Sequence, residues 1–287
     1  MIGNGTRGVA LSGVQISTSG GRAPYNCSNL LATGALPAGT QLNTDCTISG
    51  TPAASGTFNF TATVTDSTLG IGPFSQTTGA LSLTIAAPVL SLSPASGALP
   101  GGAAGVAYSQ TFTANGGTTP YVYARTSGAV PPGLTLADGT LSGTPTVAGT
   151  YNFDITVTDA SSAGSGGPYS RVQSYSVSVA QGSQTITFNA LPNVSLSASP
   201  LALSATASSG LTVGFTSITM GVCSVVGTSV TLLQPGTCSI IASQDGDAGW
   251  APAADVVRSF TVTPANLVLN AGAASAPRVG DNYSQSN

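Results

Sequence analysis

The chain has no histidine, no lysine and no glutamate, and its charged residues are six arginines and nine aspartates among 287 residues. Most of the side chains that act as general acids, general bases or nucleophiles are therefore absent. Charged residues make up 5% of the chain and the net charge is −3, so no basic face is available for nucleic acid or anionic lipid. We expect a protein that is not an enzyme, needs no cofactor and binds no nucleic acid.

Long apolar runs are also lacking. No run approaches the roughly 18 apolar residues that a membrane span needs, so we expect no direct membrane insertion. Residues 1–7 lack the apolar segment of a secretory signal. The chain is therefore either a mature product or a piece of a longer protein.

The composition disfavours helices. Without lysine and glutamate, the i,i+4 ion pairs that support exposed helices cannot form. Threonine and valine are frequent and favour pleated surfaces, and 37 glycines and 18 prolines punctuate stretches in which apolar residues alternate with Thr or Ser. We predict an all-β fold with almost no helix.

A repeat gives the size of the folding unit. Residues 50–66 return as residues 143–159, and the aligned Phe60 and Phe153 are 93 residues apart. A repeat of this length is a whole small domain, and its alternating strands predict a β-sandwich and not a solenoid turn. The residues between and after the two copies complete a division of the chain into four segments: 1–86, 87–180, 181–264 and 265–287.

The first of these segments is incomplete. Gly8-Val-Ala-Leu-Ser12 aligns with Gly105-Val-Ala-Tyr-Ser109, so nothing in residues 1–86 corresponds to the first strand that Leu90 and Leu92 predict for the second segment. We therefore expect residues 1–86 to form a sandwich without its first strand and residues 87–180 to form a complete one.

Four cysteines fall into two local pairs, Cys27 with Cys46 and Cys223 with Cys238. A zinc site would need closer spacing or histidine ligands, so we predict two disulfides. Each closes a loop of roughly 15 to 20 residues, which stabilises the fold by about 3 kcal/mol in the chain-entropy model. Disulfides persist in oxidising compartments, which indicates an extracellular protein. Gly227 predicts a hairpin that the Cys223–Cys238 bridge would staple across its strands.

The motifs of the repeat resemble a known family. At residues 36–66 and 130–159, the chain reads Leu-Pro-x-Gly, then Ile/Leu-Ser-Gly-Thr-Pro, Gly-Thr-Tyr/Phe-Asn-Phe and Val-Thr-Asp. This pattern resembles the immunoglobulin-like, cadherin-like domains of large bacterial surface proteins, and residues 203–210 with 236–244 look like another bacterial Ig-like repeat. The resemblance implies a tandem array of three Ig-like β-sandwich domains in an extracellular stalk, spacer or adhesin. It brings no catalytic residues.

Cadherin-like domains suggest calcium at domain junctions. Asp66 and Asp159 close equivalent strands, and Asp245 and Asp247 form a short acidic pair. Calcium takes six to eight oxygen ligands, whereas each of these places offers one or two carboxylates. We therefore favour turn and strand-end roles for all four aspartates and predict no metal.

The aromatic residues raise the alternative of a glycan site. Tyr25, Tyr121, Tyr123 and Trp250 could stack on sugar rings if they shared one exposed face, although aromatic strand residues more often pack in a core or between domains. Three function classes follow. The leading one is a non-catalytic structural protein of a surface fibre or stalk; the others are an adhesin or carbohydrate-binding module with a cell-surface glycan or protein ligand, and a phage virion fibre or decoration protein.

The tail at residues 265–287 resembles the first strand of a further domain. Leu267, Val268 and Leu269 repeat the spacing of the strand at 90–92 that residues 1–86 lack. One interpretation is that the tail completes the first domain of another copy by strand addition and so builds a head-to-tail filament. The other is that a longer array was cut at arbitrary points. In either case the expected partners are other copies of the chain or neighbouring Ig-like domains.

Overall fold

A computed structural model describes residues 1–266. These residues form strands joined by turns, and their helices are two 3₁₀ turns, η1 (Ala163–Ser165) and η2 (Leu196–Ala198). The all-β prediction is confirmed. The chain divides into two compact units, residues 1–182 and the residues from Ser183 onward. The domain boundaries expected after residues 86, 180 and 264 stay predictions.

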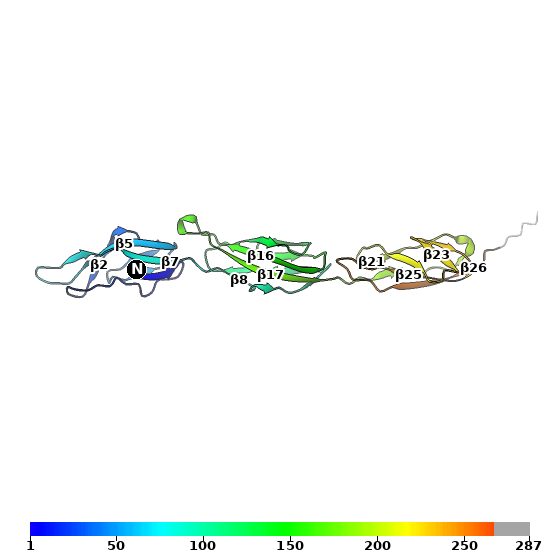
Figure 1. Cartoon of the computed structure of the whole chain (residues 1–287), viewed down its shortest axis with the longest axis horizontal. Helices are drawn as coiled ribbons and strands as arrows, with labels where there is room; N and C mark the ends of the chain where they lie inside the picture. The colour runs from blue at the N-terminus through cyan, green and yellow to red at the C-terminus, as the bar shows by residue number, and fades with distance from the viewer. Residues whose placement is uncertain (267–287) are drawn as a thin grey trace, which may run out of the picture. The chain divides into compact units, whose positions relative to one another are not determined.

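The N-terminal sandwich, defined here as β1 to β7, has a five-stranded sheet in the order β1-β7-β5-β2, with β6 paired to β5, and a two-stranded β3-β4 hairpin. Figure 1 shows β5 and β7 side by side in this sandwich. Its strands are β1 (Gly3–Thr6), β2 (Asn26–Gly34), β3 (Thr40–Leu42), β4 (Ile48–Gly50), β5 (Gly56–Thr65), β6 (Ser75–Thr77) and β7 (Leu81–Ala86).

The middle sandwich, β8 to β17, has a five-stranded sheet in the order β10-β17-β16-β13 with β9 paired to β17, a three-stranded β11-β15-β14 sheet and a β12-β8 pair. Strands β16 and β17 form its longest ladder (Figure 1). Its strands are β8 (Ser91–Ser93), β9 (Gly97–Ala98), β10 (Gly102–Ala103), β11 (Tyr108–Thr111), β12 (Thr113–Asn115), β13 (Val122–Gly128), β14 (Leu134–Ala137), β15 (Thr140–Gly143), β16 (Gly149–Thr158) and β17 (Ser170–Ala180).

Alternation in the sequence fixes which face of each strand is buried. Along β16, Phe153, Ile155 and Val157 are buried while the residues between them are partly exposed. Successive side chains of a strand point to opposite faces, so this pattern places the three apolar residues in the core between the sheets. Burying each contributes on the order of 1.5–3 kcal/mol. In the N-terminal sandwich, β5 repeats the pattern with Phe60 and Ala62 buried.

The two sandwiches share one topology. Strand β1 runs parallel to β7, with Gly3 opposite Leu83, as β10 runs parallel to β17, with Gly102 opposite Val179. The middle sandwich has one more strand, β8, which precedes this position and pairs antiparallel with β12. Among residues 1–266, the N-terminal sandwich has no counterpart of β8 before β1, as the repeat alignment predicts.

The C-terminal sandwich, β18 to β26, has a four-stranded sheet in the order β19-β26-β25-β22, a three-stranded β20-β24-β23 sheet and a β18-β21 pair. The predicted hairpin is β23-β24, with Gly227 in its turn at φ 58°. The strands are β18 (Ile186–Phe188), β19 (Val194–Ser195), β20 (Leu201–Ala202), β21 (Ala205–Ala207), β22 (Gly214–Ser217), β23 (Cys223–Val226), β24 (Ser229–Leu232), β25 (Gly236–Ser243) and β26 (Val256–Thr263).

Candidate functional site

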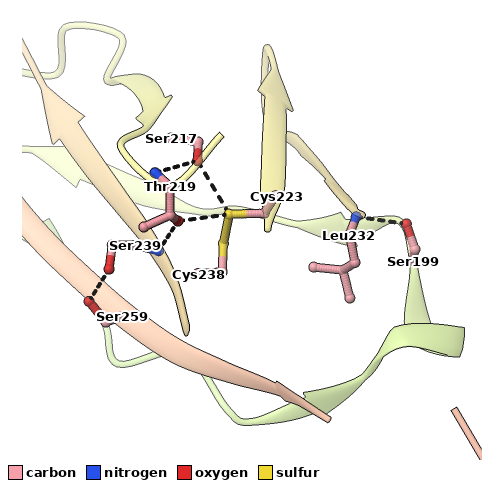
Figure 2. The surroundings of a disulfide bond; sticks show 8 residues. All are labelled: Ser199, Ser217, Thr219, Cys223, Leu232, Cys238, Ser239 and Ser259. Carbon is pink, nitrogen blue, oxygen red and sulfur yellow. Dashed lines mark hydrogen bonds between the residues drawn. A yellow bond between two sulfur atoms is a disulfide. The ribbon is translucent and has the colours of Figure 1, made fainter. Parts of the chain in front are cut away.

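Both disulfides are present, Cys27–Cys46 and Cys223–Cys238, and all four cysteines are buried. Cys223 lies in β23 and Cys238 in β25, so this bridge joins the two facing sheets and does not staple the β23-β24 hairpin to itself. Figure 2 shows Ser217 and Thr219 beside the Cys223 sulfur, with oxygen–sulfur distances of 3.3 and 3.5 Å. The bridges therefore tie together the layers of the first and third sandwiches.

In the middle sandwich, other residues occupy the cysteine positions. Gly139 takes the turn position of Cys46, and Tyr123 takes the strand position of Cys27. A Cβ on Gly139 would lie 3.0 Å from the ring of Tyr123. The tyrosine ring fills the space that the bridge takes in the N-terminal sandwich, so the middle sandwich is held by aromatic packing there.

A buried carboxylate, that of Asp159, follows the end of β16. Its Oδ2 accepts hydrogen bonds from the backbone N–H of Thr118 (2.9 Å) and the hydroxyl of Ser161 (2.5 Å). Its Oδ1 accepts from the backbone N–H groups of Ser161 (3.2 Å) and Tyr169 (2.8 Å). The four donors fix the loop that connects β16 to β17 around a single negative charge.

Asp66 repeats this arrangement after β5. Its Oδ2 accepts from the backbone N–H of Arg22 (3.3 Å) and the hydroxyl of Thr68 (2.5 Å), and its Oδ1 from the backbone N–H groups of Thr68 (3.2 Å) and Phe74 (2.9 Å). Asp66 and Asp159 therefore hold equivalent loops, which agrees with the strand-end role expected from the sequence.

A glycine makes room for each carboxylate. Gly21 and Gly117 have φ values of +67° and +65°, and a Cβ on either would lie 2.5 Å from Oδ2 of Asp66 or Asp159. The left-handed backbone and the close approach both require glycine. The Gly-Gly pairs of the sequence thus belong to the carboxylate sites, although the sequence pattern alone reads as an ordinary turn.

Hydrogen bonding to the charged form lowers the pKa of both carboxyl groups. For Asp66, the Thr68 hydroxyl and the Phe74 N–H lower the pKa from 3.8 to about 2. For Asp159, burial acts to raise the pKa, but the hydrogen bonds from Ser161, Tyr169 and Thr118 outweigh it and the net shift is downward. Both groups are ionised at neutral pH.

Arg7 joins the N-terminal sandwich to the Asp159 site. Its Nη1 lies 3.9 Å from Oδ2 of Asp159 and donates to the hydroxyl of Ser161 at 2.6 Å. Its Nη2 donates to the hydroxyl of Thr118 at 3.1 Å, and its Nε donates to the carbonyl of Ala53 in its own sandwich at 2.8 Å. The guanidinium thus bridges the two sandwiches of the first compact unit.

Further contacts lie around this bridge. The guanidinium carbon of Arg7 is 5.5 Å from the centre of the Tyr169 ring, which is a cation–π distance. The Tyr169 hydroxyl is hydrogen-bonded to the Ser55 hydroxyl, and the N–H of Ser55 donates to the carbonyl of Ser165 at 3.2 Å. The loop between β16 and β17 therefore docks on the N-terminal sandwich through polar and cation–π contacts.

The sequence did not identify Arg7 as a functional residue. Its partners Thr118, Ser161 and Tyr169 are more than 100 positions away, and the aligned position of the second repeat is Ala104, so no repeated motif marks it. The available signal was its rarity, because it is one of six arginines and lies directly before the aligned Gly8 segment.

The four calcium candidates do not converge. Asp66 and Asp159 sit in separate sandwiches, and Asp247 accepts backbone hydrogen bonds from Gly249 (2.7 Å) and Trp250 (2.9 Å) in a turn that follows Asp245. Within residues 1–266, no three His, Cys, Asp or Glu side chains are grouped as metal ligands would be. The cation beside Asp159 is the guanidinium of Arg7, and calcium binding at these aspartates stays untested.

The tyrosines of the alternative glycan site have structural partners. The hydroxyl of Tyr25 donates to the carbonyl of Gly20, and that of Tyr121 donates to the carbonyl of Gly116, each at 2.5 Å. These two tyrosines hold equivalent Gly-Gly turns in two different sandwiches. Tyr123 packs against the core of the middle sandwich. Trp250 belongs to the Asp247 turn of the C-terminal sandwich.

An open groove lies in the N-terminal sandwich where the middle sandwich holds β8. Its volume is about 450 Å³, and residues 17–21 line one side while residues 74–79 line the other. Residues 17–19 are equivalent to β12, the strand that pairs with β8. The equivalence follows from the preceding residues, because the Ile16 N–H donates to the Cys46 carbonyl as the Phe112 N–H donates to the Gly139 carbonyl. The groove is therefore the unfilled position of a strand.

Two equivalent glycines, one in each sandwich, show whether a strand fills this position. A Cβ on Gly116 would collide with the backbone carbonyl oxygen of Val89, which leads into β8. The equivalent Gly20 has a similar φ, +80° against +85°, but a Cβ there would meet nothing within 4 Å. In residues 1–266, the described chain fills this position in one sandwich and leaves it open in the other.

No helix within these residues has the length and apolar character to cross a membrane.

Substitution of Arg7 tests the bridge between sandwiches. We expect Arg7→Ala to lower the free energy of unfolding by about 1–3 kcal/mol, because it leaves the Asp159 carboxylate without its counter-charge. Arg22→Ala is the control, since Arg22 is exposed and contributes its backbone N–H to Asp66. Urea unfolding checks both variants. Equal stability of the two variants would contradict the role of Arg7.

The pH dependence of stability tests the Asp66 site. Its folded pKa of about 2 lies below the unfolded value near 3.8, so its stabilising contribution is present above about pH 4 and is lost as the pH falls toward 2. We expect Asp66→Asn to lower the Tm at pH 7 and the difference from the native chain to narrow between pH 4 and pH 2. Parallel Tm curves over that range would refute the assignment.

Substitution of the two equivalent glycines, Gly20 and Gly116, tests whether the groove is open. Gly20→Ala and Gly116→Ala both incur the roughly 1 kcal/mol cost of a left-handed backbone. Gly116→Ala adds a collision with Val89, so we expect it to be the more destabilising by at least about 1 kcal/mol in the free energy of unfolding. If Gly20→Ala is equally destabilising in dilute solution, the groove is not open.

The comparisons with known proteins agree with the two repeats. The chain matches the family described as "Putative Ig domain" twice, over residues 5–86 and 87–180. No curated protein matches it.

Several solved ectodomain structures are similar to the chain at low identity. Mouse cadherin-23 EC22-24 is 13% identical, with 91% of this chain and 93% of that chain covered and a TM-score of 0.31. Drosophila N-cadherin EC1-3 is 10% identical, with 92% and 100% covered and a TM-score of 0.31. The insect immune protein hemolin is 11% identical, with 92% and 74% covered and a TM-score of 0.29.

The family model covers more than half of the chain and coincides with the two sandwiches that hold the Asp66 and Asp159 sites, and the chain therefore belongs to the Putative Ig domain family.

Proposed function

We propose that the chain is a non-catalytic structural module of an extracellular fibre or stalk, of the kind that large bacterial surface proteins carry. Its copies join head to tail when the tail of one copy, residues 265–287, adds a strand to the N-terminal sandwich of the next. The observation that carries this proposal is the open groove at the position that β8 fills in the middle sandwich.

The location outside the cell rests on the cysteines. Both bridges are buried and no described cysteine is free, which suits a protein that folds in an oxidising compartment. The surface is polar but carries few charges, so contacts between copies meet little charge repulsion.

Strand β8 provides the template for the donated strand. Leu90 and Leu92 are buried in the middle sandwich, and Leu92 lies opposite Ala114 of β12. Leu267, Val268 and Leu269 lie outside the described residues, and their sequence repeats the apolar spacing of residues 90–92. By equivalence we place Leu269 opposite Thr18 in the groove of the acceptor copy. Main-chain hydrogen bonds then supply affinity and the two leucines supply register.

The adhesin and carbohydrate-binding alternative has less support. It needs aromatic side chains gathered on one exposed face, whereas Tyr25 and Tyr121 donate to turn carbonyls in different sandwiches. The virion fibre or decoration alternative has no specific contact in its favour. The structural role in a surface fibre is therefore the function that the geometry supports best.

Deletion of the tail tests strand donation. We expect the native chain to form concentration-dependent oligomers in sedimentation velocity and the chain without residues 265–287 to sediment as a monomer. Leu267→Asp with Leu269→Asp should act like the deletion, because charged side chains cannot enter the core side of the groove. Val279→Asp, in the same tail but outside the strand, is the matched control and should assemble normally.

The acceptor side has its own variant. Gly20→Ala adds a Cβ into the space that the donated strand would occupy, as the Gly116 position shows. We expect it to weaken assembly, while the monomer stays folded because the left-handed backbone at Gly20 costs the substituted chain only about 1 kcal/mol. Oligomers that persist after the deletion, or a native chain that stays monomeric, would overturn the proposal. The latter result would leave the groove to a preceding segment of a longer chain.

A further inference from the structure

An apolar loop lies exposed at one end of the N-terminal sandwich. Residues 67–74 follow Asp66, and the side chains of Leu69, Ile71 and Phe74 are 77%, 91% and 55% exposed. No residue of this loop is charged. Three large apolar side chains that are exposed within six positions favour contact with another protein surface over water.

The equivalent loop of the middle sandwich is an interface. It runs from Asp159 to Tyr169 and contacts the base of the N-terminal sandwich, defined as the end of that sandwich formed by Arg7 and residues 51–55. The contacts are those of Ser161 and Tyr169 with Arg7 and of Ser165 and Tyr169 with Ser55. Since Asp66 holds residues 67–74 with the same four hydrogen bonds, this loop presents the same docking end of its sandwich, without a partner within residues 1–266.

The surface that contacts the exposed loop must differ in charge from the surface that contacts the Asp159 loop. Thr118, whose hydroxyl accepts from Arg7, is replaced in the N-terminal sandwich by Arg22. The Thr68 hydroxyl remains there as the counterpart of Ser161, but a second guanidinium would meet the like charge of Arg22. The like charge of Arg22 and the exposed apolar side chains of residues 67–74 together favour a base that is uncharged and apolar over one that presents an arginine.

The C-terminal sandwich has a base of this kind. It consists of two turns, residues 219–222 and 233–235, that are held together by the hydrogen bond from the Leu233 N–H to the Val222 carbonyl (2.8 Å). Met220 and Leu233 on these turns are 72% and 50% exposed, and neither turn contains a charged residue.

The tail, residues 265–287, begins at this same base. Val262, near the end of β26, pairs with Gly236, which directly follows the turn at residues 233–235. Pro264 is three residues before Leu267, and Ala86 at the end of β7 is four residues before Leu90. A donated strand would thus bring the donor's C-terminal base against the acceptor's exposed loop, as the linker between the first two sandwiches brings the N-terminal base against the Asp159 loop.

We propose that residues 67–74 dock on the base of the C-terminal sandwich of a second copy, with Leu69, Ile71 and Phe74 packed against Met220 and Leu233. This contact rests on the proposed strand donation and adds to it a second surface, which shares only Phe74 with the groove. The partner is therefore another copy of the chain, which docks through the base of its C-terminal sandwich.

Paired substitutions on the two surfaces test the contact. On the acceptor, Leu69→Ser with Ile71→Ser, and on the donor, Met220→Ser with Leu233→Ser, should each weaken self-association by about tenfold or more in sedimentation velocity, because each removes exposed apolar area that the contact would bury. The control is Val226→Ser, an exposed valine at the far end of the β23-β24 hairpin. Equal monomer Tm values confirm that the variants fold.

The outcomes separate this contact from strand donation. If the paired variants associate like the native chain while tail deletion abolishes assembly, the docking contact is wrong and strand donation stands. If the paired variants lose association and tail deletion does not, the contact stands and strand donation is wrong. A native chain that stays monomeric at all concentrations overturns both.

Discussion

An open strand position in the N-terminal sandwich is the constraint on which the account of this protein depends. In the middle sandwich, β8 covers β12 and buries Leu90 and Leu92, so the sheet edge is paired and the core is closed. In the N-terminal sandwich, residues 17–19 occupy the place of β12 beside an open groove. An edge of this kind is a template for strand addition from another chain. In the proposed assembly, the middle sandwich is therefore the completed example and the N-terminal sandwich is the acceptor.

A carboxylate organises the end of each of these two sandwiches. Asp66 and Asp159 hold equivalent loops with four hydrogen bonds each, and a glycine in the left-handed region makes room for each. The difference lies in what the loop meets. Arg7 neutralises Asp159 and joins the first two sandwiches. In the N-terminal sandwich, Arg22 stands at the position of Thr118, and the loop after Asp66 exposes apolar side chains. With so few charges in the chain, one arginine, Arg7, supplies the charged contact between the first two sandwiches.

The sequence predicted the fold because its information is local. Alternating apolar residues such as Phe153, Ile155 and Val157 fix the face of a strand, and the 93-residue repeat fixes the domain. The Arg7 bridge could not be predicted, since its partners are more than 100 positions away and no motif marks them. The Cys223–Cys238 bridge was predicted as a hairpin staple, but it joins two sheets, because sequence spacing does not show which layer a strand enters.

Hydrogen exchange at the amides of residues 17–19 measures the central claim directly. If the tail of another copy pairs with this edge, these amides exchange slowly in the full chain at concentrations where it assembles and quickly in the chain without residues 265–287, while the amides of β12 stay protected in both. Rapid exchange of residues 17–19 in the assembled full chain would contradict strand donation into the groove.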